Sequence, residues 1–278
     1  MMRATPTNPM SSTGLTIGVF DSGFGGLTVL RELLPRIPGA HYIYLGDTAR
    51  LPYGSKSQTT IARYAVESAR FLEAHGAEHL VIACNTASAL ALREIRASVS
   101  IPVTGVIDPV VEAAHRRHPN GDVLVLATPA TVQSHAYQIE CVARGLRASE
   151  KSCPLLVPLV EEGWCEHSIT REVLRIYLRE ALANCRPEAV LLGCTHYPLI
   201  APAIAATLQE LGSQAEVIDS ARATAIAIEQ SIRFSHPATS GAATFQCYAT
   251  DSVDKFARLG SQFLGQTIPN VELLDLGG

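Results

Sequence analysis

Charge is scarce in this sequence. Asp, Glu, Lys and Arg make up 17% of its 278 residues, the net charge is −4, and no run of basic residues occurs. A nucleic acid or an anionic membrane surface is therefore not an expected partner. The chain also lacks an apolar stretch of about 18 uncharged residues, which a membrane-spanning helix needs. Its 47% of apolar residues is enough to bury a sizeable core.

Signals for export are missing as well. Residues 1–13 are polar and contain no apolar segment of the kind found in a signal peptide, so we expect a disordered leader. The seven cysteines are odd in number, and none lies in a C-x-x-C pair. The sequence therefore predicts a protein of the reduced cytoplasm.

Short apolar runs rich in Val, Ile and Leu recur along the chain and predict strands. They do not alternate strictly between apolar and polar residues, so both faces of the sheet should be covered. Helical stretches such as 59–77 and 170–185 lie between them, and this alternation is typical of a parallel sheet with helices on both sides. The expected strands are 16–20, 41–46, 79–84, 102–107, 122–128, 153–160, 189–194 and 215–220.

The runs repeat at a nearly constant spacing of about 106 to 111 residues. The similar pairs are 16–22 with 122–128, 79–86 with 189–196, and 103–108 with 215–220. This repeat predicts an α/β fold with two pseudo-symmetric parallel-sheet domains that face each other across a central cleft. The expected limits are 14–108 plus 220–278 for the first domain and 109–219 for the second. Ligands of such sheets bind beyond the carboxyl ends of the strands.

Two cysteines stand at equivalent places in the repeat. Cys84 ends the run 79–84 and Cys194 ends the run 189–194, and each is followed by polar residues that open a helix. Backbone N–H groups at a helix start favour the thiolate, which is the form of cysteine that acts as a base. A thiol on each wall of a cleft suits a reaction that removes a proton from one face of a carbon and adds one to the other.

Two turns at strand ends are further candidates for a ligand site. Asp21 and Ser22 precede a glycine-rich turn at 23–26, which suits either anion binding or an ordinary strand–helix connection. A second turn, formed by Pro52, Tyr53 and Gly54, could lay backbone donors against a small ligand.

Neutral donors follow both cysteines. Asn85, Thr86 and Thr195 could hold carboxylate oxygens without adding charge. His196 could exchange a proton with a thiol or a substrate. Cys and His are too few at this point for a zinc site, so no metal is expected. Weaker candidates are Thr128 and Thr131 after 122–128, and Glu161 or Glu162 after 153–160.

In this order, the motifs closely resemble those of the aspartate/glutamate racemase superfamily, on its glutamate-specific branch. The matching strings are GVFDSGFGGLTVL, YLGDTARLPYGSKS, ACNTASA, PLVEEG and GCTHYPL. The His196 position separates the branches, because aspartate racemases typically carry Glu there. Residues 127–131 depart from the family, which more often has glycines around the two threonines.

The resemblance implies the two-domain fold and an interconversion of L- and D-glutamate without any cofactor, which supplies D-glutamate for peptidoglycan. It implies that Cys84 removes the α-proton of D-glutamate and Cys194 that of L-glutamate, while the opposite thiol returns a proton. Asp21 would assist Cys84, and His196 with Glu161 would assist Cys194. The substrate would be lined by Asp21, Ser22, Pro52, Tyr53, Gly54, Cys84, Asn85, Thr86, Thr128, Thr131, Cys194, Thr195 and His196. A homodimer is also expected.

The residues alone leave three other functions open. A member of the same superfamily could racemise aspartate or a hydantoin. A hydrolase or acyltransferase could use Cys194 with His196, and it would not need Cys84. A protein that only binds glutamate would leave the α-hydrogen unexchanged.

Overall fold

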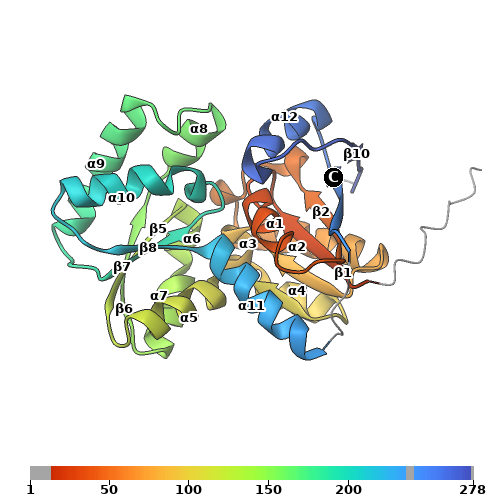
Figure 1. Cartoon of the computed structure of the whole chain (residues 1–278), viewed down its shortest axis with the longest axis horizontal. Helices are drawn as coiled ribbons and strands as arrows, with labels where there is room; N and C mark the ends of the chain where they lie inside the picture. The colour runs from red at the N-terminus through yellow and green to blue at the C-terminus, as the bar shows by residue number, and fades with distance from the viewer. Residues whose placement is uncertain (1–13, 236–240, 277–278) are drawn as a thin grey trace, which may run out of the picture.

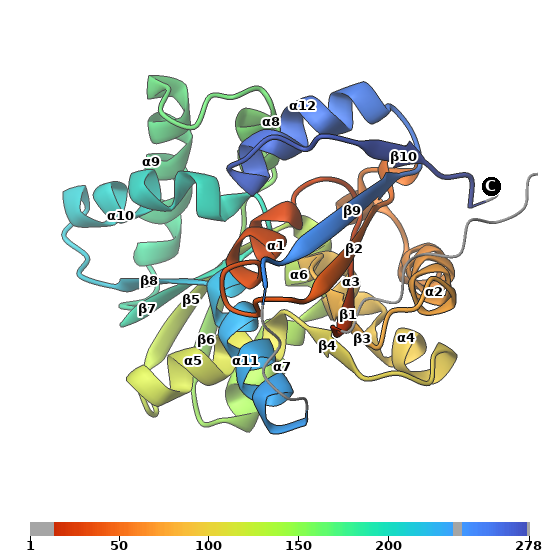
Figure 2. The same ribbon diagram turned by 45° about the vertical axis from the view of Figure 1, so that its right-hand side comes forward.

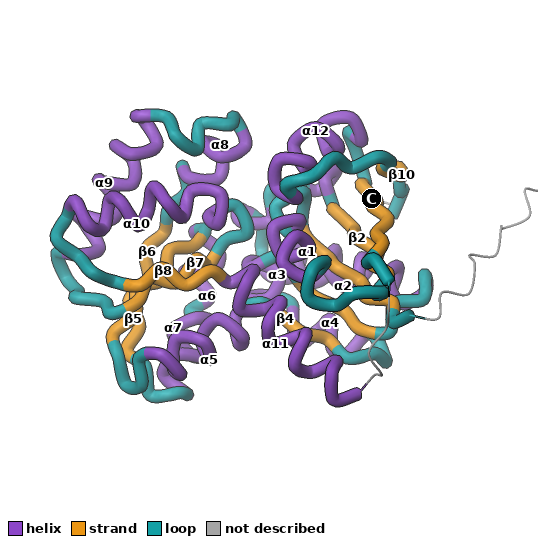
Figure 3. The backbone as a smooth tube through the Cα atoms, viewed as in Figure 1, coloured by secondary structure: helices purple, strands orange, loops and turns teal. Residues whose placement is uncertain are grey.

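The computed structural model describes residues 14–235 and 241–276. It has two lobes, each built on a parallel sheet with helices on both faces (Figures 1 and 3). The predicted leader, residues 1–13, lies outside the described residues. Within the described ranges, no helix is both long enough and apolar enough to cross a membrane.

The first lobe, on the right in Figure 1, contains a six-stranded sheet in the order β10-β9-β2-β1-β3-β4. All neighbouring strands are parallel. Figure 2 shows β9 lying beside β2, so the chain returns to this lobe after building the other one. The strands are β1 (Thr16–Asp21), β2 (His41–Gly46), β3 (His79–Ile82), β4 (Val103–Gly105), β9 (Thr244–Ala249) and β10 (Val271–Leu273).

Successive residues of β1 point to opposite faces of this sheet. Ile17 and Val19 lie in the apolar core that the sheet shares with one group of helices, and Phe20 lies in the core of the other group. Both faces are therefore covered, as the lack of alternation predicted. The first group is α1 (Leu27–Leu33), α11 (Ser220–Ser235) and α12 (Val253–Leu264), and the second is α2 (Gln58–Ala74), α3 (Asn85–Leu90) and α4 (Leu92–Ser98).

The second lobe contains a four-stranded parallel sheet in the order β6-β5-β7-β8. Along β5, Val123 and Val125 pack toward one group of helices, whereas Leu124 and Leu126 pack toward the other. The strands are β5 (Asp122–Ala127), β6 (Arg147–Ser152), β7 (Ala189–Gly193) and β8 (Glu216–Asp219). The first group of helices is α5 (Ile107–Arg117) and α7 (Ala136–Ala143), and the second is α8 (Leu156–Glu161), α9 (Ser168–Leu182) and α10 (Ala201–Glu210).

Short helices fill the connections. Helix α6 (Pro129–Ser134) follows β5, and the 3₁₀ helices are η1 (Thr48–Arg50), η2 (Tyr53–Ser55) and η3 (Tyr197–Ile200). Helix α11 packs against both α1 and α5, and so joins the two lobes along one side (Figure 1).

The two sheets are related by the sequence repeat. The order β2-β1-β3-β4 in the first lobe recurs as β6-β5-β7-β8 in the second, so β1 corresponds to β5, β3 to β7 and β4 to β8. The predicted fold of two pseudo-symmetric parallel-sheet units is therefore confirmed. The domain limits at 108/109 and 219/220 stay a prediction.

One predicted strand is wrong. Residues 153–160 contain helix α8, and the strand of this region is β6, just before it. A short apolar run does not distinguish a strand from a buried helix, and Leu156 and Val160 are buried one turn apart on α8. β6 has the polar sequence RASEKS because it lies at the edge of its sheet. The repeat could have predicted β6, because a shift of about 106 residues places β2 on β6.

The remaining predicted elements are confirmed. The other seven expected strands are present, and the helical stretches 59–77 and 170–185 correspond to α2 and α9. The last two strands, β9 and β10, were not predicted.

Candidate active site

Cys84 lies where β3 ends and α3 begins. It is the N-cap of α3, and its Sγ accepts a hydrogen bond from the Ala87 N–H at 3.4 Å. Its thiol also donates to the Ser22 Oγ at 3.6 Å. Only 5% of the residue is exposed. The structure thus places this thiol at a helix start, as the sequence predicted, and brings Ser22 beside it.

Asp21 ends β1 and is buried beside the Cys84 wall. Its Oδ2 accepts from the Gly23 N–H at 2.9 Å, while its Oδ1 has no hydrogen-bond partner among the described residues. Burial raises the pKa of this carboxyl group, and the Gly23 N–H opposes that effect. A Cβ at Gly26 would lie 2.6 Å from the Asp21 Cβ, so only glycine lets the turn pass this close. The outcome is a carboxylate oxygen free to accept a proton.

Cys194 follows β7 and lies beside a histidine and a carboxylate. Its Sγ is 4.0 Å from the His196 Nδ1, and the His196 Nε2 is 3.2 Å from the Glu161 Oε1. The Thr195 Oγ1 is 3.4 Å from the same Nδ1. These groups form a row from thiol to imidazole to carboxylate. The structure therefore brings Glu161, and not the exposed Glu162, to this wall.

The surroundings of Cys194 differ from the prediction in one respect. The cysteine does not cap an α-helix, because η3 begins at Tyr197 and α10 follows it. The His196 ring instead lies against two aromatic rings, with Phe24 at 6.0 Å and Phe263 at 4.9 Å between centroids. Phe263 comes from α12, near the end of the chain, and no motif pointed to it.

A cluster of threonines connects the lobes. The Thr86 Oγ1 lies 3.1 Å from that of Thr128 and 3.2 Å from that of Thr131, which are 2.9 Å from each other. Thr128 caps α6, with Pro129 in the first turn. A capped helix therefore brings both threonines to the site without the glycines typical of the family.

Asn85 is the first residue of α3 and is 3% exposed. Its Oδ1 accepts from the hydroxyl of Tyr137 at 2.6 Å. Its Nδ2 has no hydrogen-bond partner within the described part of the chain. Tyr137, on α7 of the other lobe, belongs to none of the sequence motifs.

The turn at 52–54 approaches the threonine cluster through its backbone. A Cβ at Gly54 would lie 3.5 Å from the Thr128 Cβ. The hydroxyl of Tyr53 donates to the Asp47 Oδ2 at 2.5 Å, so this side chain is held away from a ligand. Pro52 is exposed. Asp47 is fully buried and was missed by the sequence analysis, although it follows β2 in the same way that Cys84 follows β3.

The two cysteine walls are in contact through the glycine-rich turn. A Cβ at Gly25 would lie 2.3 Å from the Thr195 Oγ1 and 2.7 Å from the His196 Cε1. The Thr28 hydroxyl donates to the Thr195 carbonyl at 3.0 Å. These contacts place the residues after β1 directly against the residues after β7.

Burial favours the protonated form of both cysteines. Burial above all, and then the charge of Asp21, raises the pKa of Cys84 to about 12. Burial also raises the pKa of Cys194, and the charges of Cys84 and Asp21 add to the shift. From the sequence, the helix start is expected to favour the Cys84 thiolate. The Ala87 N–H does lower the pKa of Cys84, but loss of solvation outweighs it.

We predict that Asp21→Asn lowers the pKa of Cys84 below its value of about 12. The neutral amide removes a negative charge that disfavours the thiolate, so the thiolate fraction rises at any pH below the pKa. The pKa follows from the pH dependence of alkylation at Cys84, read by peptide mass spectrometry in a Cys194→Ala background.

The matched control for this titration is Asp219→Asn. Asp219 is another carboxylate at a strand end, on β8, and burial raises its pKa as well. Its replacement should leave the pKa of Cys84 unchanged. An unchanged or higher pKa in Asp21→Asn itself would contradict the electrostatic link.

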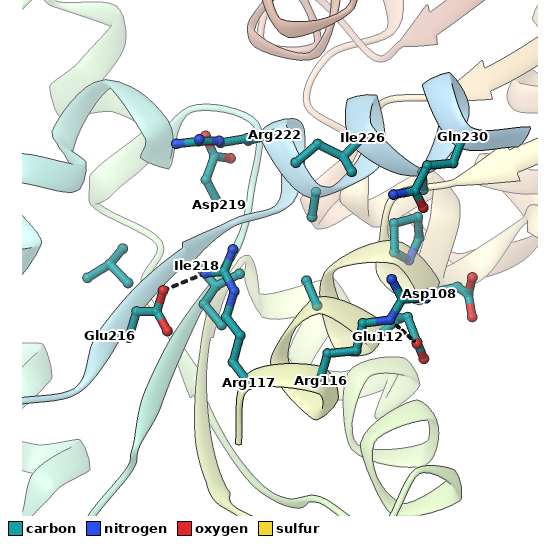
Figure 4. A pocket seen from close by; sticks show the side chains of 15 residues that line it. Asp108, Glu112, Arg116, Arg117, Glu216, Ile218, Asp219, Arg222, Ile226 and Gln230 are labelled. Carbon is teal, nitrogen blue, oxygen red and sulfur yellow. Dashed lines mark hydrogen bonds and ion pairs between the residues drawn. The ribbon is translucent and has the colours of Figure 1, made fainter. Parts of the chain in front are cut away.

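A separate cavity of about 340 Å³ lies where the chain crosses between the lobes. It is lined by α5, β8 and α11, and Figure 4 shows Arg117 reaching across it to Glu216. Neither active-site cysteine lines this cavity. The residues expected to bind substrate lie elsewhere, so this cavity is not the candidate active site.

No group of three or more His, Cys, Asp or Glu side chains suited to hold a metal occurs among the residues that the structure describes. Independence from metals and cofactors stays a prediction.

Comparisons with known proteins agree on one family. The Asp/Glu/Hydantoin racemase family model matches residues 20–228. A glutamate racemase of Koribacter versatilis (strain Ellin345) is 47% identical, over 97% of this chain and 100% of its own length. The crystal structure of Francisella tularensis glutamate racemase in complex with D-glutamate has a TM-score of 0.86 and 33% identity, and covers 95% of this chain and 98% of that one. A Bacillus anthracis glutamate racemase isoform has a TM-score of 0.87 and 32% identity, with the same coverage.

Proposed function

The chain belongs to the Asp/Glu/Hydantoin racemase family and is an amino-acid racemase, and on that premise we propose that it interconverts L- and D-glutamate without a cofactor. The observation that carries the proposal is the pair of buried cysteines at the ends of the equivalent strands β3 and β7. Glutamate as the substrate is supported by the similarity to glutamate racemases and by the D-glutamate complex of the Francisella protein.

In the proposed reaction, one cysteine acts as a thiolate and takes the α-proton, and the other, as a thiol, gives a proton to the opposite face and becomes a thiolate. Cys84 acts on D-glutamate and Cys194 on L-glutamate, as the family resemblance implies. One base reaches only one face of a held carbon, so two are needed. The thiols interact electrostatically, and they therefore titrate as a pair in which one is thiolate while the other stays protonated.

Burial favours the protonated form of both cysteines, so the cysteine that acts as the base must first pass its proton to a neighbouring group. Asp21, with a free Oδ1, is proposed to serve Cys84. His196 is proposed to serve Cys194 through its Nδ1, and Glu161 would then stabilise the charged imidazole through the Nε2. Each wall thus has a thiol with its own proton acceptor.

The substrate carboxylates are proposed to be held by neutral donors. Such donors stabilise the charge that develops on the α-carboxylate when the proton leaves. They come from both lobes, so binding would fix the distance between the two walls. The proposed binding residues are Ser22, Asn85, Thr86, Thr128, Thr131, Thr195 and His196, with the backbone of Pro52, Tyr53 and Gly54.

The physiological setting is also a proposal. D-Glutamate made by this reaction would enter peptidoglycan, and so support cell-wall formation and cell shape. A cytoplasmic location, inferred from the unpaired cysteines and the missing export signal, and a homodimeric state are proposals as well.

The decisive experiment is incubation of the purified protein with L-glutamate in D2O without added cofactor. We expect α-deuteration together with decay of optical rotation toward zero, because solvent supplies the returned proton. Aspartate and a hydantoin serve as parallel substrates, and preferred turnover of either would reassign the substrate. Binding of glutamate without α-exchange would overturn the racemase mechanism.

The row Cys194–His196–Glu161 also matches the arrangement of a cysteine hydrolase. Such an enzyme would form an acyl group on Cys194 and would not need Cys84. Family membership favours the racemase. Detection of an acylated Cys194 peptide would be needed to support the hydrolase function instead.

A further inference from the structure

We propose that Tyr137 is a positioning residue, which holds the Asn85 amide so that its Nδ2 donates to a carboxylate of the amino-acid substrate. This inference rests on the proposed function and adds a residue that lies outside the recognised motifs. It is carried by three features of Tyr137 and Asn85: the bond between them, the unpaired end of the amide, and the packing of the ring.

The bond joins the two lobes. Tyr137 is completely buried on α7 of the second lobe, and its hydroxyl donates to the Asn85 Oδ1 at 2.6 Å. Asn85 is the neighbour of Cys84 in the first lobe. A short bond between fully buried partners fixes both side chains, because no water competes for either group.

The bond also decides which end of the amide remains available. Burial raises the pKa of Tyr137 well above its usual value, so the hydroxyl keeps its proton. With the Oδ1 occupied, the Nδ2 is the free end, and it has no acceptor among the described residues. A buried donor without a partner is unfavourable in a folded protein, and a bound substrate would supply the missing acceptor. Asn85, the residue after Cys84, therefore offers a buried N–H group without an acceptor.

The ring of Tyr137 contacts the opposite wall. A Cβ at Gly193 would lie 3.2 Å from the Tyr137 Cε2, so the ring packs against the end of β7, immediately before Cys194. The charge of Cys194 is also among the influences that raise the Tyr137 pKa. One side chain thus touches the strand that ends at one cysteine and bonds to the neighbour of the other.

The chemistry selects a carboxylate as the acceptor. The Nδ2 is a neutral donor and so does not add a second positive charge that would compete with the substrate's ammonium group. A carboxylate oxygen accepts from it in the bound substrate and keeps this hydrogen bond during proton removal. Loss of the Tyr137 hydroxyl would let the amide rotate and turn its Oδ1 toward the carboxylate, which is repulsive.

The test begins with Tyr137→Phe, which removes one oxygen and keeps the ring. We expect kcat/KM to fall about tenfold in both directions, mainly through a higher KM, because the donor holds the ground state as well as the transition state. The matched control is Tyr42→Phe. Tyr42 is equally buried, and its hydroxyl donates to the Leu33 carbonyl in the first lobe. This control should lose thermal stability to a similar extent but keep its KM.

A double-mutant cycle separates positioning from packing. In an Asn85→Ala background, Tyr137→Phe should change KM by less than about twofold, since the amide it positions is gone. Asn85→Asp provides a second variant that keeps the acceptor for Tyr137 and replaces the donor by a negative charge. It should fold normally and raise KM by about a hundredfold, because an acceptor now faces the carboxylate.

Two results would overturn the inference. One is a KM for Tyr137→Phe that matches Tyr42→Phe, and the other is an equal effect of Tyr137→Phe with and without Asn85. In either case an active wild type leaves the racemase function intact. If the wild type fails to exchange the α-hydrogen of glutamate, the function itself fails, and the positioning role fails with it.

Discussion

Replacing either active-site cysteine by alanine should abolish racemisation of glutamate. Each thiol is the only proposed base for its own face of the α-carbon, so Cys84→Ala and Cys194→Ala should each lower kcat by about 10⁴-fold or more in both directions. Racemisation needs removal at one face and return at the other, and loss of one base stops the full cycle. Initial rates from each enantiomer, measured by polarimetry, give the answer.

Two other buried cysteines are matched controls for this prediction. Cys141 on α7 and Cys247 on β9 are both completely buried, as small core side chains. Their replacement by alanine should lower the melting temperature slightly and leave kcat close to wild type. Near-normal racemisation by Cys84→Ala or Cys194→Ala would rule out the two-base mechanism.

The sequence predicts the strands that lead to the two cysteines but misses three others, β6, β9 and β10. Cys84 and Cys194 are found because each follows a largely apolar strand and precedes polar residues, so the change from apolar to polar is sharp. The missed strands β6, β9 and β10 have no such contrast. β6 and β10 lie at the edges of their sheets, where residues are partly solvated, and β9 lies between β10 and β2 but has only two buried residues. The false strand at 153–160 has a different origin. Its apolar residues are the buried side of helix α8, and a short apolar run does not distinguish a helix from a strand.

Contacts between the two lobes are the second feature that could not be predicted from the sequence. Tyr137 lies about 52 residues from Asn85, and Phe263 lies about 67 residues from His196. No local pattern links such partners, because their proximity depends on how the lobes pack. The repeat predicts two similar units but does not state which helix of one meets which loop of the other. The rise of the cysteine pKa values has the same cause, since burial comes from both lobes at once.

His196→Asn should depress turnover, and more strongly from L-glutamate than from D-glutamate. The imidazole lies 4.0 Å from the Cys194 Sγ, the thiol proposed to act on L-glutamate, and asparagine cannot take over its proton. We expect kcat from L-glutamate to fall about a hundredfold, with a smaller fall from D-glutamate. Asparagine keeps a polar group of similar reach, so folding and much of the ligand binding should persist.

Equilibrium limits how this asymmetry can be expressed. The equilibrium constant between enantiomers is one, so both kcat/KM values must fall by the same factor, and only kcat and KM separately can differ by direction.

The control is His79→Asn, since His79 is also buried and bonds to the Thr104 hydroxyl at 3.0 Å on the outer part of the first sheet. It should lose stability without losing turnover. An unchanged kcat in both directions for His196→Asn would remove this residue from the chemistry. A large loss of thermal stability, greater than that of the control, would instead assign it to packing between Phe24 and Phe263.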